Sequence, residues 1–186
     1  QPWLNGAVVL EELWDRKRAA AWYRRAATLT PDPEVVSALA WAQWRAGDLA
    51  AATTTFARAL ERRPDMPSAL LGMARVQLDS GSPEAALKYL ERAETAAPLL
   101  NVVGFYKGKA YEAMRAPEKA LDAYRRTVAA DSYFAEGRDA LGKLYLRQRN
   151  YNEAWRQFSR ILDLEPKNRK IISLLNRVTP LLTRIP

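Results

Sequence analysis

An alanine that recurs at a nearly constant spacing is the feature that most constrains how this chain can fold. It occupies five positions separated by 33, 34, 34 and 34 residues: Ala19, Ala52, Ala86, Ala120 and Ala154. A large apolar or aromatic residue follows four positions later each time: Tyr23, Phe56, Leu90, Tyr124 and Phe158. A small residue precedes each alanine by twelve positions: Ala7, Ala40, Ala74, Gly108 and Gly142. Registers that agree across five copies predict a repeat architecture, in which each unit packs on its neighbours.

Within one copy, the spacing predicts two helices joined by a short turn. Residues four and seven positions after the alanine share one face of a helix, here called helix B, because an α-helix has 3.6 residues per turn. The small residue twelve positions earlier belongs to a preceding helix, helix A, where a bulky side chain would push the two backbones apart. No segment alternates with the period of two that marks a strand, so the expected fold class is all-α. Ala46-Gly47-Asp48 is a candidate turn between A and B, and the candidate N-caps of A helices are Asp32, Asn101, Ser132 and Asn168.

These registers resemble the tetratricopeptide repeat (TPR), a 34-residue helix–turn–helix unit with the pattern W-x2-L-G-x2-Y…A-x3-F…P. The first aromatic position of that pattern is filled here by Trp3, Val36, Leu70, Gly104 and Arg138. The resemblance implies a right-handed superhelical α-solenoid that forms a single domain over residues 1–186, with repeats at about 1–32, 33–66, 67–100, 101–134 and 135–168. A capping helix at about 169–178 and a tail at 179–186 would follow; alternatively, a further segment begins at Pro180.

The composition restricts the chemistry that the chain can carry out. The sequence contains no Cys and no His, which excludes disulfides, thiolate nucleophiles, Ser-His-Asp catalysis and the usual zinc sites. It also contains neither a phosphate-binding glycine loop nor the spacing of a calcium-binding loop. We therefore expect no enzyme activity, no metal and no cofactor.

The net charge of +8 suits an acidic partner, a nucleic acid or another anionic polymer. The basic residues are scattered along the chain and no base-reading motif accompanies them, so nucleic acid is the alternative and a protein is the preferred partner. No apolar run is long enough to span a membrane. The chain begins QPWLNGAVV, without a signal-peptide pattern or an initiator Met. It is therefore expected to be a fragment or a processed chain, and periplasmic and cytoplasmic locations in a bacterium both stay open.

The resemblance implies that the A helices line a concave groove, which receives a peptide or a partner segment. The ninth position of the repeat points away from the core stripe of helix A, and it is cationic in four successive copies. Aromatic residues also lie off the core stripe in the second and fourth copies, and such residues are common at binding hot spots. The predicted partner-binding residues are Trp41, Trp44, Arg75, Phe105, Tyr106, Lys109, Lys143 and Arg177.

Structural alternatives stay open for several of these residues. Trp44 could pack on the neighbouring A helix, and Phe105 could fill the space beside Gly104. The cations of the third, fourth and fifth copies could form ion pairs with carboxylates three or four residues away: Asp79, Glu112 and Asp139. Three other tryptophans adjoin core positions and are expected in the core: Trp3, Trp22 and Trp155.

The predicted function is a non-enzymatic interaction scaffold that binds an extended protein or peptide segment of acidic or aromatic character. Some TPR proteins grip the C-terminal carboxylate of a chaperone peptide with a set of Lys and Asn residues, and that set is absent here. The composition, rich in Ala and Arg, is similar to that of bacterial TPR modules that organise envelope or secretion assemblies. An inert spacer between other domains is a further reading, and the oligomeric state stays open.

Overall fold

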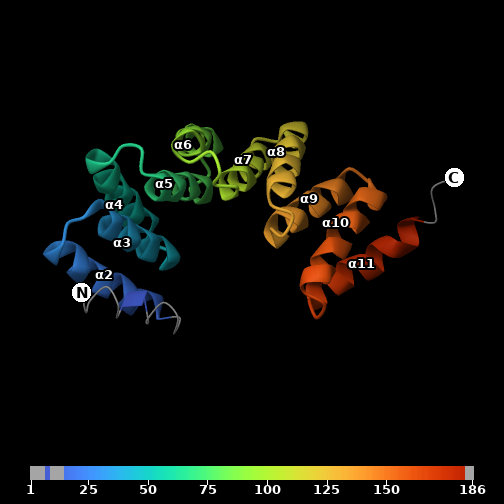
Figure 1. Ribbon diagram of the computed structural model, residues 1–186, viewed down its shortest axis with the longest axis horizontal. Helices are drawn as coiled ribbons and strands as arrows, with labels where there is room; N and C mark the ends of the chain where they lie inside the picture. The colour runs from blue at the N-terminus through green and yellow to red at the C-terminus, as the bar shows by residue number, and fades with distance from the viewer. Residues whose placement is uncertain (1–6, 9–14, 183–186) are drawn as a thin grey trace. The chain divides into compact units, whose positions relative to one another are not determined.

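The computed structural model describes residues 7–8 and 15–182, and within them the regular structure is entirely helical (Figure 1). The predicted all-α class is confirmed. The chain divides into two compact units, Gln1–Val103 and Gly104–Pro186, each with its own hydrophobic core. A single solenoid of five repeats across both units stays a prediction. The helices are α2 (Arg16–Leu29), α3 (Pro33–Arg45), α4 (Leu49–Arg62), α5 (Pro67–Asp79), α6 (Pro83–Ala96), α7 (Val102–Ala113), α8 (Pro117–Ala130), α9 (Ala135–Arg147), α10 (Tyr151–Leu164) and α11 (Arg169–Leu182).

Unit 1 (residues 1–103) is built around two helical hairpins, α3 with α4 and α5 with α6, which pack on each other. Helix α2 packs against α3. The recurring alanines lie at the contacts, and Ala52 and Ala86 are fully buried. Phe56 and Leu90, four residues later, are fully buried as well. The small residue lets the neighbouring helix approach and the large one fills the remaining space, so the register seen in the sequence is the packing register of unit 1.

Unit 2 (residues 104–186) repeats this arrangement with α9 against α10, which are flanked by α8 and α11. The alanine register continues at Ala120 and Ala154, and both residues are fully buried. The large residues that follow, Tyr124 and Phe158, are also fully buried. The core of unit 2 is therefore made by the same two registers as that of unit 1.

The helix ends in unit 2 differ from the sequence-based expectation at two places. Helix α9 has Phe134 at its N-cap, so the cap predicted at Ser132 is wrong. The preceding segment forms a turn in which the backbone N–H of Tyr133 donates to Asp131 Oδ1 at 3.0 Å. Helix α11 continues to Leu182 with Pro180 inside it, whereas the sequence predicts that the capping helix ends at about residue 178.

Each of the four turns from helix A to helix B that lie within residues 15–182 contains one residue with a positive φ, and these residues are spaced by 34. Gly47 and Gly81 have φ of 85° and 76°, and Arg115 and Arg149 have φ of 57° and 59°. The backbone hydrogen bonds are alike in all four turns: the N–H of Asp48, for example, donates to the carbonyl of Gln43 at 3.0 Å. This is the bond that closes a helix whose C-terminal residue is left-handed, a position that glycine fills without steric cost. Two of the four turns therefore carry an arginine in a conformation that favours glycine.

Arg115→Gly is expected to stabilise the protein by about 0.5–1 kcal/mol, because a side chain in the left-handed region is sterically disfavoured. Urea unfolding monitored by circular dichroism measures the change. Arg115→Ala is the matched control, since it removes the same side chain but keeps the Cβ that causes the conflict. If alanine stabilised the protein as much as glycine, the gain would come from the loss of the arginine side chain and not from relief of the left-handed backbone.

Candidate binding surface

Two tryptophans and an arginine form a stacked cluster in unit 1, on α3 and α5. Trp41 and Trp44 lie about one turn apart on α3, and their rings meet edge to face with centroids 5.7 Å apart. The guanidinium carbon of Arg75, on α5, lies 3.7 Å from the ring centroid of Trp44 and 5.2 Å from that of Trp41. The structure therefore brings together three of the predicted site residues from two different helices.

An acidic side chain and the core hold this cluster in place. The indole N–H of Trp44 donates to Oδ2 of Asp79 at 2.6 Å, and Asp79 lies one turn after Arg75 on α5. Trp41 meets Phe56 edge to face, with ring centroids 5.4 Å apart. Both tryptophans are partly buried against the core of unit 1. Trp44 thus packs on the neighbouring A helix. Its ring is held in place by Trp41 on α3 and by Arg75 and Asp79 on α5.

The aromatic residues of α7 lie in unit 2. Phe105 is partly buried, and its ring centroid is 5.4 Å from that of Phe134 and 5.9 Å from that of Tyr124. Tyr106 meets Phe105 edge to face at 5.1 Å. The Nζ of Lys109, an exposed side chain, lies 5.3 Å from the Phe105 centroid. Phe105 therefore packs on the core of unit 2 and at the same time carries a cation on its ring.

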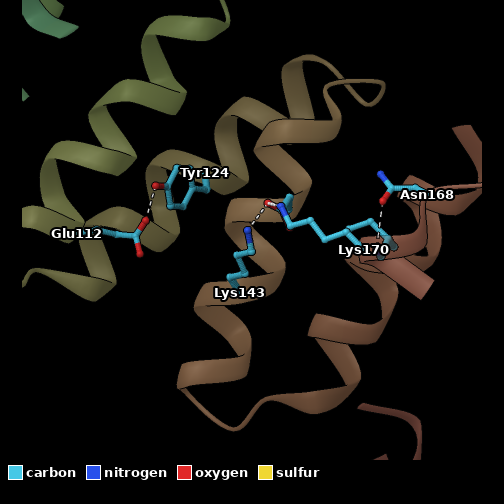
Figure 2. Close-up of polar contacts among 7 residues, drawn as sticks. Glu112, Tyr124, Lys143, Asn168 and Lys170 are labelled. Carbon is cyan, nitrogen blue, oxygen red and sulfur yellow. Dashed lines mark hydrogen bonds and ion pairs between the residues drawn. The ribbon is translucent and has the colours of Figure 1, made fainter. Parts of the chain in front are cut away.

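In unit 2, a cluster of two lysines and one aspartate joins α9 and α11. The ammonium groups of Lys143 and Lys170 both contact Oδ2 of Asp139, which lies one turn before Lys143 on α9 (Figure 2). The ion pair between Lys143 and Asp139, which the sequence left open as an alternative, is therefore present, and it is extended by a lysine from the next A helix. Arg177, the last predicted site residue, is exposed on α11.

A polar network that the sequence did not indicate links three helices of unit 2. The Tyr124 hydroxyl, on α8, donates to Oε2 of Glu112 on α7 at 2.5 Å (Figure 2). Arg147, on α9, contacts the other carboxylate oxygen of Glu112. Burial raises the pKa of Tyr124, which keeps the hydroxyl protonated and able to donate. Glu112, which the sequence left open as an ion-pair partner of Lys109, thus contacts Tyr124 and the Arg147 side chain of the following A helix.

The expectation that Trp22 and Trp155 lie in the core is wrong: their exposed fractions are 37% and 38%. Each adjoins a fully or almost fully buried residue, Tyr23 in one case and Ala154 in the other. A step of one residue turns the side chain by about 100° around the helix, which moves it off the buried stripe. Trp3 lies outside the described residues.

Two residues of this surface were not predicted from the sequence: Asp79, which accepts a hydrogen bond from Trp44, and Lys170, the second lysine that contacts Asp139. Both contacts join residues more than 30 positions apart. The repeat length was the available signal, because residues about 34 apart occupy corresponding places on adjacent A helices. Within the described ranges 7–8 and 15–182, no group of acidic side chains could hold a metal ion, and no helix is long and apolar enough to cross a membrane.

Comparison with known proteins agrees with this architecture. Residues 37–100 match the family model described as "Tetratricopeptide repeat". The structure superposes on TTC0263, a thermophilic TPR protein of Thermus thermophilus, with a TM-score of 0.81 at 24% sequence identity, and the match covers 98% of each chain. The chain has the TPR fold. The solenoid type and the family resemblance predicted from the sequence are confirmed.

Two further solved structures show the breadth of this TPR similarity. PilF of Pseudomonas aeruginosa superposes with a TM-score of 0.83 at 16% identity, over 98% of this chain and 83% of PilF. YrrB, described as a TPR protein with an unusual peptide-binding site, superposes with a TM-score of 0.64 at 20% identity, over 93% of this chain and 90% of YrrB. No curated protein sequence gives a significant match. TPR proteins in general are protein-interaction scaffolds and are typically non-enzymatic.

Proposed function

We propose that this protein is a non-enzymatic interaction scaffold that holds an extended, acidic segment of a protein partner on the exposed side of its A helices. The proposed contacts are Trp41, Trp44, Arg75, Phe105, Tyr106, Lys109, Lys143 and Arg177. The composition is the ground for proposing a bacterial envelope or secretion assembly as its setting. The observation that carries the proposal is the stacked cluster of Trp41, Trp44 and Arg75.

The cluster has the properties of a binding hot spot. Tryptophan and arginine are the residues most enriched at such sites, since they offer a large contact area. Here the rings of Trp41 and Trp44 are fixed by Asp79 and Phe56, so little side-chain freedom remains to be lost when a partner binds. A guanidinium stacked on a ring keeps its N–H donors in its own plane, where they match the geometry of a carboxylate. The cluster therefore suits a segment in which an acidic residue adjoins an apolar one.

Arg75→Gln tests this proposal, because it keeps much of the side-chain length but removes the charge and the planar fork. Peptides are first selected from a displayed random library on the immobilised wild-type protein, and their affinities are then measured by fluorescence polarisation. We expect the selected peptides to contain an acidic residue and to bind Arg75→Gln about tenfold more weakly, a typical effect of losing a charged hydrogen-bonding partner.

Arg58→Gln is the matched control, since Arg58 is exposed on α4, a B helix of the same unit. It removes the same charge and should leave the affinity within about twofold. An equal loss in both variants would mean that the peptides respond only to net charge. A selection without any peptide family would support the inert-spacer reading.

The net charge of +8 keeps a polyanion as the second candidate. Oligonucleotide binding would favour this candidate if the logarithm of the affinity fell steeply and linearly with log[salt]. Such a slope reports the release of counterions from many phosphate contacts. A peptide bound through one guanidinium and two indole rings should show a much weaker dependence on salt.

A further inference from the structure

Two ammonium groups in unit 2 share a single carboxylate oxygen. Lys143 and Lys170 approach Asp139 Oδ2 from α9 and α11, with a Lys170 Nζ to Oδ2 distance of 3.3 Å (Figure 2). The exposed fraction of the side chain rises from 21% for Asp139 to 38% for Lys143 and 64% for Lys170. The carboxylate thus lies at the base of the cluster, and the two cations cover it on the solvent side.

This cluster is not neutral. It contains two positive charges and one negative charge, since Asp139 accepts both ammonium groups on one oxygen. Its other oxygen, Oδ1, is buried and has no hydrogen-bond donor anywhere in residues 15–182 or 7–8. The negative charge of Asp139 beside the Lys170 amine favours its cationic form. A net charge of +1 on two closely spaced ammonium groups is left for an outside anion to balance.

We propose that Lys143 and Lys170 together bind the carboxylate of an acidic side chain in the partner segment. This rests on the proposed function in one respect, namely that the anion arrives on a protein partner. A carboxylate has two oxygens that can bridge two ammonium groups, and its charge would neutralise the cluster. Charge-assisted hydrogen bonds of this kind are stronger than neutral ones. Asp139 holds the two lysines near each other before the partner arrives.

The test uses the whole chain with isotopically labelled lysine and a nine-residue Gly-Ser peptide, capped at both ends, with two adjacent glutamates at its centre. We expect the side-chain NMR signals of Lys143 and Lys170 to shift saturably with this peptide. The signals of Lys88 and Lys167, exposed lysines on α6 and in the turn before α11, should move little and without saturation. Two further peptides carry Gln-Gln or phosphoserine at the centre. The Gln-Gln peptide should not shift the NMR signals of Lys143 and Lys170.

Two double variants complete the experiment. Lys143→Gln with Lys170→Gln should weaken binding of the Glu-Glu peptide at least fivefold, and Lys88→Gln with Lys167→Gln should not. Equal shifts at all four lysines, or equal binding of the Gln-Gln peptide, would overturn the inference. A saturable shift with the phosphoserine peptide alone would also overturn it, in favour of a phosphate site. The titration of the wild-type protein remains decisive if the lysine variant loses stability.

The result is separable from that for the proposed function. The side-chain signals of Lys143 and Lys170 report the lysine pair alone, because both residues lie in unit 2 and Arg75 lies in unit 1. If the lysine signals shift while the library-selected peptides bind Arg75→Gln as tightly as the wild type, the lysine site stands and the cluster of Trp41, Trp44 and Arg75 no longer supports the proposed function. If Arg75→Gln weakens the binding of the selected peptides and the Glu-Glu peptide does not shift the NMR signals of Lys143 and Lys170, the proposed function stands and the lysine site fails.

Discussion

Phe56→Ala is expected to lower the free energy of unfolding by about 3–5 kcal/mol, the usual cost of deleting a fully buried phenylalanine ring. Phe56 has no exposed surface. Its ring packs against Trp41 on α3 and lies over Gly72 on α5, so it joins three successive helices. Removing it leaves a cavity at the contact between two helical hairpins. Because a repeat protein is stabilised by its nearest-neighbour interfaces, we expect unit 1 to lose cooperativity as well as stability.

Urea unfolding followed by circular dichroism gives the loss, and the steepness of the transition reports the cooperativity. The matched control in the same unit is Leu99→Ala, because Leu99 is 92% exposed. Surface substitutions of this kind are usually within about 0.5 kcal/mol of the wild type. A loss below about 1 kcal/mol for Phe56→Ala would show that the neighbouring helices close the cavity and that the ring does not hold the two hairpins together.

The helical hairpins and their core could be predicted because they depend on residue size at fixed spacing. Ala52, Ala86, Ala120 and Ala154 are buried where the period placed them. The left-handed turns were predictable only where glycine marks them, as at Gly47. At Arg115 and Arg149 the same backbone is imposed by the two helices that the turn must join, and no local residue type marks it.

The candidate surface could be predicted less completely than the core. The period places Trp41, Trp44 and Arg75 on the exposed side of A helices, and the structure adds that they touch each other. Which carboxylate each polar group selects depends on side-chain reach between helices. Asp79 is the acceptor for the Trp44 indole on another helix. The exposed positions of Trp22 and Trp155 show a related limit, since one residue of offset decides whether a helical side chain is buried.

Gly72→Ala is expected to cost about 1–3 kcal/mol, although alanine is the better helix former by about 1 kcal/mol. A Cβ at Gly72 would lie 2.1 Å from Cζ and 2.3 Å from Cε1 of Phe56, well inside van der Waals contact. The ring is fully buried and rests against Trp41, so it cannot swing away, and α5 must move from α4. Urea unfolding measures the change. A neutral or stabilising effect of Gly72→Ala would mean that the helices separate without loss.

The double variant shows whether that conflict is the cause. In the Phe56→Ala background the ring is gone, so the new methyl group enters the cavity and the helix propensity of alanine is no longer opposed. Gly72→Ala should then change sign and stabilise the protein by about 0.5–1 kcal/mol. The coupling energy between the two sites would be about 1.5–4 kcal/mol, far above the few tenths expected for independent positions. Additive effects would place the cost of Gly72→Ala elsewhere in α5, and the contact between Phe56 and Gly72 would not set the spacing of these two helices.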